Sequence, residues 1–227
     1  MFGEPLTGGA LPSRTLCLTF DDGPGETFGP GPGPRTLEVA RYLADEALPA
    51  TFFLSGKHVL GLPDVAAELV RLGHSVGNHS QEHLNLPELL ASGGDVVAEV
   101  RATADLLAGV ADGPLFFRPP YGAWSPEVAA ALNADSELAR THVGPVLWDI
   151  DGSDWRHWRD SSPPQDCADD YLDRIESAGR GIVLQHDCTA DSDTIKAANR
   201  TFETVLLLVP ELKSRGYTFV GLAGALG

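Results

Sequence analysis

Short apolar runs alternate along the chain with longer segments whose apolar residues recur every three to four positions. The short runs are typical of buried strands, and the longer periodic segments are typical of amphipathic helices. Seven strands are predicted, over residues 15–20, 51–54, 74–77, 115–117, 145–150, 181–184 and 217–220. Six helices are predicted, over residues 35–47, 64–72, 95–107, 125–138, 168–178 and 196–215, the last bent or broken near Pro210. This alternation indicates an α/β fold with a mainly parallel sheet.

Ionisable residues follow five of the seven predicted strands. They are Asp21 and Asp22, His79 and His83, Arg118, Asp151 and Asp154, and His186. The carboxyl ends of parallel strands are the catalytic side of α/β folds. Five adjacent strands of an open sheet would span roughly 19 Å, which is too wide for one site, whereas a barrel gathers the strand ends around one mouth. We therefore predict a distorted, incomplete (β/α) barrel of about seven parallel strands, with the site at the carboxyl ends of the strands.

Length and composition indicate the number of domains and exclude some classes of partner. The 227 residues, 43% of them apolar, are enough for one large core, so we expect a single domain over residues 1–227. Lys and Arg number 16 and Asp and Glu 32, which gives a formal net charge of −16. Such a surface argues against nucleic acid and anionic membranes as partners, and it suits a neutral or cationic substrate or simply solubility. No apolar run reaches the ~18 residues that a membrane span needs.

Location and redox state stay open at this stage. The first ten residues lack the basic start and apolar stretch of a secretory signal. We expect a monomer that is secreted or part of the cell envelope, its leader absent from this sequence, with an intracellular protein as the alternative. Cys17 lies in an apolar strand pattern and is expected in the core, whereas Cys167 and Cys188 could pair in an oxidising compartment.

The spacing of His79 and His83 is that of a metal-binding pair. On a helical turn, positions i and i+4 would put both imidazoles on one face, although two exposed histidines are an equally simple interpretation. A carboxylate from another strand end, Asp21 or Asp22, would complete a three-ligand site. Successive strand residues point to opposite faces, so both carboxylates can face the site only if the strand ends there. The dipeptide Gly23-Pro24 is expected to end the strand at this point.

Arg118 and His186 are the next candidates. Arg118 lies in an apolar segment and needs an anion, for which Asp21 or Asp22 would serve, in a catalytic pair or in an ordinary structural ion pair. His186 follows a buried-looking strand, where a lone histidine is more often structural. Because four other predicted strands are also followed by ionisable residues, His186 becomes a stronger candidate for a functional residue.

Taken in order, these residues carry a resemblance to a known family. The segments are Thr19-Phe20-Asp21-Asp22-Gly23-Pro24, His79-Ser80-Gln81-Glu82-His83, Arg118-Pro119-Pro120-Tyr121, Asp151-Gly152-Ser153-Asp154-Trp155 and Ile182-Val183-Leu184-Gln185-His186. Together they resemble the five motifs of the polysaccharide deacetylase (NodB homology) domain, carbohydrate esterase family 4. The resemblance covers essentially the whole chain. It implies a distorted (β/α) barrel and a divalent metal ion, Zn²⁺ first, with Co²⁺ or Mn²⁺ as alternatives.

The resemblance also implies a role for each motif residue. The implied metal ligands are Asp22, His79 and His83, and the implied catalytic residues are Asp21 as general base, His186 as general acid, Arg118 holding Asp21, and Asp154 orienting His186. The implied substrate-binding residues are Tyr121, through its backbone N–H facing the oxyanion, and Trp155 and Leu184, lining the acetyl pocket.

The implied activity is hydrolysis of N-acetyl groups on a polysaccharide that contains N-acetylglucosamine, of the peptidoglycan or chitin type, with release of acetate. Two alternatives stay open: hydrolysis of another bond (an O-acetyl ester on xylan or a cyclic amide), or a non-catalytic glycan-binding module. Asp21 argues against the module, because binding alone would not need it. The loop over residues 25–34 is longer and richer in Gly and Pro than is usual in the family, which bears on the glycan that fits.

Overall fold

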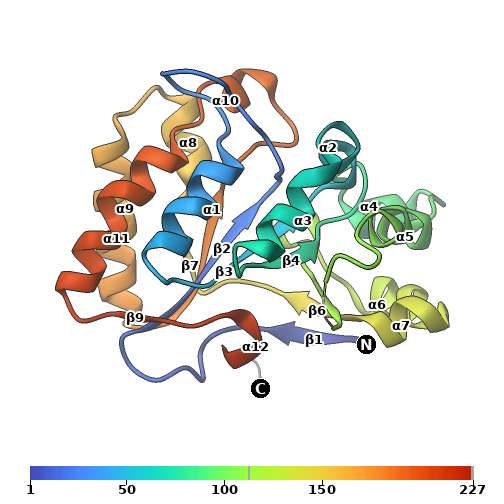
Figure 1. Ribbon diagram of the computed structural model, residues 1–227. Helices are drawn as coiled ribbons and strands as arrows, with labels where there is room; N and C mark the ends of the chain where they lie inside the picture. Colours follow the sequence, from blue (N-terminus) through green and yellow to red (C-terminus); the bar gives the residue numbers. More distant parts are fainter. Residues whose placement is uncertain (112, 226–227) are drawn as a thin grey trace.

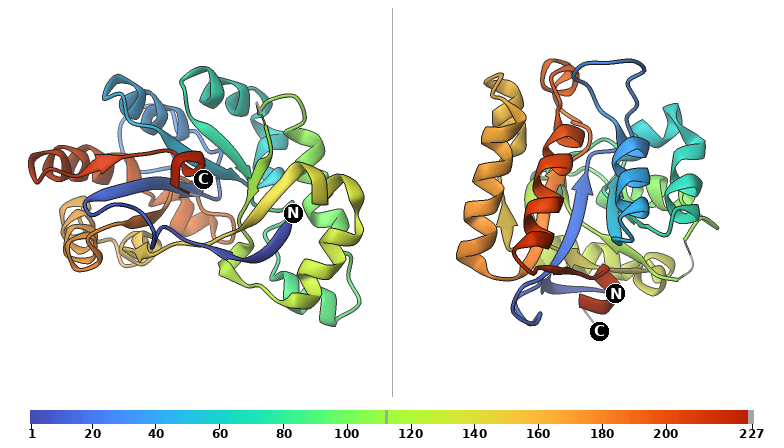
Figure 2. Two further views of the ribbon diagram at one scale, coloured as in Figure 1. Left: turned by 90° about the horizontal axis from the view of Figure 1, so that it is seen from below. Right: turned by 60° about the vertical axis from the view of Figure 1, so that its left-hand side comes forward.

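The computed structural model describes residues 1–111 and 113–225, and its described strands form a curled parallel sheet with helices on the outside (Figures 1 and 2). The strands are β1 Phe2–Leu6, β2 Thr15–Asp21, β3 Ala50–Leu54, β4 Ser75–Asn78, β5 Leu115–Phe117, β6 His142–Val146, β7 Ile150–Asp151, β8 Gly181–His186 and β9 Thr218–Phe219. Their order across the sheet is β1-β6-β5-β4-β3-β2-β8-β7, with β9 paired to the start of β2. The predicted distorted, incomplete (β/α) barrel is confirmed.

The helices cover the outer side of this sheet, and α1 packs between α11 and α3. Their bounds are α1 Thr36–Asp45, α2 Gly56–Gly61, α3 Pro63–Arg71, α4 Leu86–Ala91, α5 Val96–Leu106, α6 Pro126–Ala134, α7 Ser136–Thr141, α8 Asp154–Arg159, α9 Pro164–Ala178, α10 Asp193–Ala197, α11 Thr201–Ser214 and α12 Leu222–Ala225, with a 3₁₀ turn η1 at Pro120–Gly122. None of the helices described is long and apolar enough to span a membrane.

The described part of the chain forms nine strands, two more than the seven segments that the sequence predicts. Strand β1 was missed because its Gly and Pro give no apolar alternation. The expected strand 145–150 is two strands, β6 and β7, since the chain leaves the sheet between them. There the Asp149 carboxylate accepts hydrogen bonds from the backbone N–H groups of Gly8 and Ile182, at 2.7 and 2.8 Å, and holds the irregular segment against β8.

Two predicted helices are also divided. The segment 196–215 breaks near Asn199, where it separates α10 from α11, and α11 runs on through Pro210. The Asn199 side chain accepts from the N–H of Thr201 and donates to the carbonyl of His186, so a buried amide ties the break between the two helices to the end of β8. The segment 125–138 breaks at Asp135, whose carboxylate caps the N-terminus of α7.

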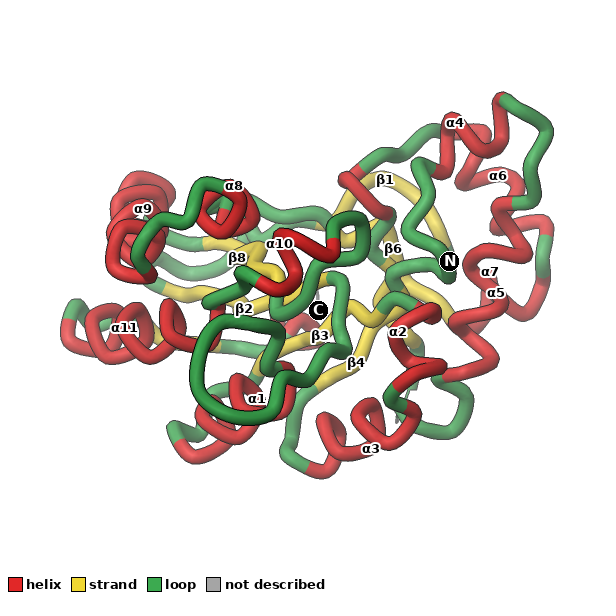
Figure 3. Tube along the Cα trace, turned by 90° about the horizontal axis from the view of Figure 1, so that it is seen from above, coloured by secondary structure: helices red, strands yellow, loops and turns green. Residues whose placement is uncertain are grey.

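Strand β2 lies inside the sheet, between β3 and β8, and positions the site. All of its residues are buried, and Phe20 stacks on Phe52 of β3 with ring centroids 5.0 Å apart. The register pairs Asp21 with His186 of β8 on one side and with Phe53 on the other. The ends of β2 and β8 therefore bring these two ionisable residues to the same level, below the loops that gather over the sheet in Figure 3.

The three cysteines, Cys17, Cys167 and Cys188, are buried free thiols. Cys17 lies in the core, as predicted. The pairing of Cys167 with Cys188 that the sequence left open does not occur in this structure, since neither thiol is in a disulfide.

Candidate active site

The two adjacent carboxylates reach one site because the chain turns at the second of them. Strand β2 ends at Asp21, and Asp22 has a φ of 73°, in the left-handed region that non-glycine residues seldom adopt. His58 Nδ1 donates to the backbone carbonyl of Asp22 at 2.6 Å and helps to hold this conformation. The prediction that the strand ends here is confirmed, and the turn begins at Asp22 itself, one residue before Gly23.

A loop, and not a helix, brings the imidazole rings of His79 and His83 together. His79 and His83 lie in the loop after β4, so the predicted helical turn was wrong. Ser80 and His83 have φ values of 63° and 61°, and the Asn78 side chain accepts from the N–H of Ser80. This reversal of the chain brings the two imidazole rings to a centroid distance of 5.0 Å.

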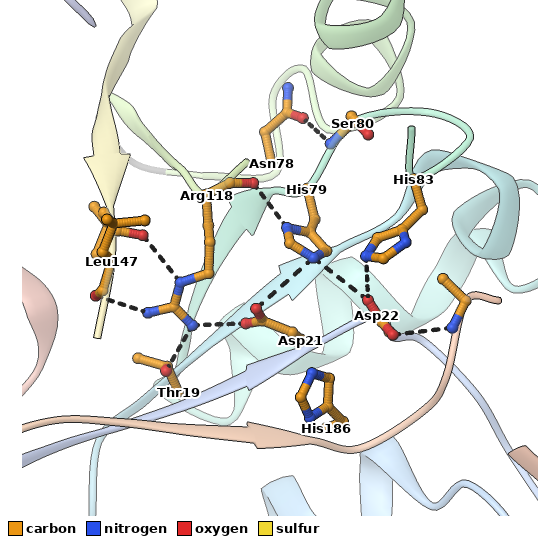
Figure 4. Close-up of polar contacts among 12 residues, drawn as sticks. Thr19, Asp21, Asp22, Asn78, His79, Ser80, His83, Arg118, Leu147 and His186 are labelled. Atoms are coloured by element: carbon orange, nitrogen blue, oxygen red, sulfur yellow. Dashed lines mark hydrogen bonds and ion pairs between the residues drawn. The ribbon is translucent and has the colours of Figure 1, made fainter. Parts of the chain in front are cut away.

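Asp22, His79 and His83 form a buried triad with the geometry of a metal site (Figure 4). Asp22 Oδ1 lies 3.4 Å from His79 Nε2 and 3.1 Å from His83 Nε2. The Nδ1 atoms face away from the triad and donate, from His79 to the carbonyl of Arg118 at 2.7 Å and from His83 to Asp191 Oδ1 at 3.0 Å. Donation from Nδ1 leaves Nε2, the ring nitrogen nearest Asp22, as the atom that would ligate a metal ion after losing its own proton.

The electrostatics of the triad fit a cation. Asp22 Oδ1 is buried and accepts no hydrogen bond within the described residues. Although burial opposes it, the imidazoles of His83 and His79 hold the pKa of Asp22 well below its usual range. The pKa of His83 is raised to about 9 against the effect of burial, chiefly by Asp22. The triad can hold a metal ion, which would take the place of a proton between the carboxylate and the rings.

Arg118 is fully buried beside this triad. Its Nη1 donates to Asp21 Oδ1 at 2.7 Å and to Thr19 Oγ1 at 2.8 Å, and its Nε donates to the carbonyl of Val146 at 3.0 Å. The guanidinium also lies over the Phe53 ring, 4.2 Å from its centroid. Burial lowers the pKa of Arg118, but the Asp21 carboxylate opposes this. Of the two partners that the sequence left open for Arg118, the structure selects Asp21.

A second acid–histidine pair lies at the end of β8. Asp154, the first residue of α8, is fully buried and accepts from both Nδ1 and the backbone N–H of His186, each at 2.7 Å. Against the effect of burial, the Asp154 carboxylate raises the pKa of His186 to about 10. The ring is thus held as an imidazolium that can donate a proton.

A cavity of about 450 Å³ joins these groups. Of the predicted site residues, Asp21, Asp22, His79, His83, Tyr121, Trp155, Leu184 and His186 line it. Arg118 and Asp154 lie behind the wall and contact lining residues. Tyr121 has a φ of 60°, a strained conformation of the kind that clusters at functional sites.

Other lining residues were missed by the sequence analysis. Trp148 and Asp191 line the same cavity, and His58 contacts Asp22 from behind. No motif spacing marked these positions. Only the position of Asp191 in the loop after β8 could have drawn attention to it.

The fold and the site together define a (β/α)-barrel protein with a metal-binding triad at the carboxyl ends of its strands. The polysaccharide deacetylase family profile matches residues 8–136, and the chain belongs to this family, the hydrolases of carbohydrate esterase family 4. The chitooligosaccharide deacetylase of Sinorhizobium fredii is 33% identical over 219 residues, which are 94% of this chain and 91% of that protein.

Solved structures share the fold. The peptidoglycan N-acetylglucosamine deacetylase Bc1960 matches with a TM-score of 0.75 at 24% identity, covering 98% of this chain and 92% of its own. A pseudoenzyme of the same family from Bacillus anthracis, BA3943, matches with a TM-score of 0.70 at 22% identity, covering 95% of this chain and 66% of its own. The fold by itself therefore does not decide whether a chain is active.

Proposed function

We propose that this protein is a metal-dependent hydrolase that removes N-acetyl groups from N-acetylglucosamine units of a chitin- or peptidoglycan-type glycan and releases acetate. One observation carries the proposal: a carboxylate held by Arg118 and an imidazolium held by Asp154 line the same cavity as the Asp-His-His triad. A glycan-binding module would have no use for this pair of opposed proton-transfer groups. The name of the Sinorhizobium relative supports the N-acetylglucosamine substrate.

Asp22, His79 and His83 would hold the metal ion. Two imidazole nitrogens and one carboxylate oxygen are a donor set that suits Zn²⁺, and Co²⁺ or Mn²⁺ can occupy the same ligands. When bound, such an ion polarises a carbonyl oxygen and lowers the pKa of a water molecule from 15.7 toward about 7.

Asp21 would act as the general base. Its Oδ1 accepts from Arg118, and its Oδ2 lies 3.7 Å from His79 Nε2, on the triad side of the carboxylate. The Arg118 guanidinium balances the negative charge of this buried carboxylate, which can take the proton of the attacking water. The carboxylate becomes neutral as the new carbon–oxygen bond forms.

His186 would act as the general acid. The imidazolium donates a proton to the amide nitrogen as the carbon–nitrogen bond breaks, so the sugar leaves as an amine. Asp154 keeps Nδ1 protonated and thereby leaves Nε2 as the atom that delivers the proton. The proton taken up by Asp21 and the one given by His186 balance over a turnover.

Trp155, Leu184 and Tyr121 would bind the substrate. The first two place apolar surface in the cavity, where the acetyl methyl group can lie. The backbone N–H of Tyr121 would donate to the oxyanion, a contact worth about 3–4 kcal/mol for one well-placed donor. We also propose a monomer with this one catalytic domain, acting outside the cytoplasm, where such glycans lie.

The test is metal analysis joined to acetate release from N-acetylglucosamine oligomers, peptidoglycan and acetylated xylan. We expect acetate from the first two when Zn²⁺ is present and none after chelation. Acetate from xylan alone would favour O-deacetylation. Metal and oligomer binding without acetate from any substrate would favour the non-catalytic module.

A further inference from the structure

The loop over residues 187–192, between β8 and α10, is attached to the metal-binding triad at two points. The backbone N–H of Ala190 donates to Asp22 Oδ2 at 2.9 Å. One residue later, Asp191 accepts from His83 Nδ1, with Oδ1 and Oδ2 each 3.0 Å from that nitrogen. One short segment therefore contacts two of the three ligand side chains.

Asp191 also holds the opposite wall of the cavity. The hydroxyl of Tyr121 donates to Asp191 Oδ2 at 2.8 Å, and the Tyr121 ring meets the His83 ring edge-on at a centroid distance of 4.7 Å. A single carboxylate thus connects the loop after β8, the loop after β4 and the 3₁₀ turn η1. Tyr121 is the residue whose backbone is in the left-handed region.

The two histidines of the triad are oriented in different ways. His79 donates to the backbone carbonyl of Arg118, which is part of the buried strand end and cannot turn away alone. His83 depends on a side chain, and the Asp191 side chain is 43% exposed. His83 is consequently the triad ligand whose orientation one substitution at the cavity wall can release.

We propose that Asp191 is a positioning residue of the metal site, which fixes His83 with Nε2 toward Asp22 and holds Tyr121 against the cavity. This rests on the proposed function only in naming the site as one for a metal. The partner of the non-ligating nitrogen commonly sets the ring orientation and basicity of a ligating histidine, and its removal typically costs 10–100-fold in metal affinity or activity. Because Asp191 also accepts a hydrogen bond from the Tyr121 hydroxyl, its loss is expected to lower turnover as well.

The experiment measures Zn²⁺ affinity by competition with a chromophoric chelator, which needs no substrate. Asp191→Ala is expected to weaken Zn²⁺ binding 10–100-fold. Asp191→Asn is expected to restore most of it, because an amide oxygen still accepts from His83 Nδ1. Asp193→Asn is the matched control, two residues away on the exposed start of α10, and it should bind Zn²⁺ as the wild type does.

A second measurement follows the link to Tyr121. Tyr121→Phe removes only the hydroxyl, so it should lower kcat for acetate release at saturating Zn²⁺ and leave the affinity for Zn²⁺ unchanged. In the Co²⁺-loaded protein, Asp191→Ala should shift the visible absorption bands, since they report the ligand geometry, and Asp193→Asn should not.

Wild-type Zn²⁺ affinity in Asp191→Ala, with unchanged Co²⁺ bands, would overturn this proposal and leave the proposed function intact. Zn²⁺ binding by the wild type without acetate from any glycan would overturn the proposed function alone, because the affinity comparison still reports on Asp191. A wild type that binds no divalent metal would overturn both. Thermal unfolding of each variant separates these results from misfolding, and the exposure of Asp191 makes a folded variant the expected outcome.

Discussion

Arg118 and Asp21 form an ion pair that is almost completely withdrawn from water, with Nη1 and Oδ1 2.7 Å apart and side-chain exposures of 0% and 4%. Taking both charges out of water is costly, and the cost is offset by the hydrogen bonds that Arg118 also makes to Thr19 and to backbone carbonyls. The pair therefore serves the site more than the stability of the fold, because it fixes the Asp21 carboxylate beside the triad.

Breaking this pair from the arginine side should destabilise the protein strongly. Arg118→Ala leaves the Asp21 carboxylate buried without the guanidinium, and we expect a loss of about 3–5 kcal/mol in the free energy of unfolding. Urea denaturation at pH 7 measures it. The double variant Arg118→Ala with Asp21→Ala should lose less than the sum of the single variants. Strictly additive losses would contradict a direct interaction between the two groups.

The two adjacent aspartates should separate metal binding from catalysis. Asp21→Asn keeps the shape and removes the base, so we expect turnover to fall by about 10²–10⁴-fold with Zn²⁺ still bound. Asp22→Asn removes a charged ligand, so both Zn²⁺ content and acetate release should fall. Metal analysis and an acetate assay on the same samples make the comparison. Loss of Zn²⁺ in Asp21→Asn would show that Asp21 is itself a ligand.

Binding of Zn²⁺ should stabilise the folded protein. The triad is assembled from the turn after β2 and the loop after β4, and it does not exist in the unfolded chain, so the ion binds the folded state alone. At a free Zn²⁺ concentration a thousand times Kd, the gain is about 4 kcal/mol. Calorimetric unfolding of metal-free and Zn²⁺-loaded protein measures it, with Asp22→Asn as the control that should show little gain. Equal melting temperatures in the wild type would contradict a metal site.

Much of the site could be predicted because its chemistry follows strand ends. Asp21 and His186 were placed together from the alternation of strands and helices, and the register of β2 with β8 bears this out. The need of a buried guanidinium for an anion led from Arg118 to a carboxylate of the β2 end, which the structure identifies as Asp21. These inferences rest on periodicity and desolvation, which are properties of single segments.

The other parts of the site depend on loop conformation and on contacts between distant segments. The sequence of a single segment does not reveal either of these. The spacing of His79 and His83 predicted a helical turn, but left-handed residues bring the rings together instead. Asp191 is 108 residues from the histidine that it contacts. Strand β1 has no apolar alternation in its own sequence. It forms because it pairs with β6, which lies about 140 residues later in the chain.

The Asp154–His186 pair makes a pH-dependent prediction whose sign can be worked out. The pKa of His186 is about 10 in the folded protein, above its value of about 6.5 when unfolded. The pair therefore stabilises the fold fully below pH 6.5, and this contribution is lost as the pH rises through 10. Asp154→Asn should lower the pKa of His186, so its cost in stability should be larger at pH 6 than at pH 10.5. Urea denaturation at the two pH values measures the difference.

The same pair should set the alkaline limb of activity, since His186 must be protonated to act as the acid. Asp154→Asn should move that limb of kcat/KM to lower pH, and His186→Ala should reduce turnover over the whole range with Zn²⁺ still bound. The imidazole NMR signals of His186 in the metal-free protein report the pKa directly. An unmoved limb, or full activity in His186→Ala, would remove His186 from the role of acid.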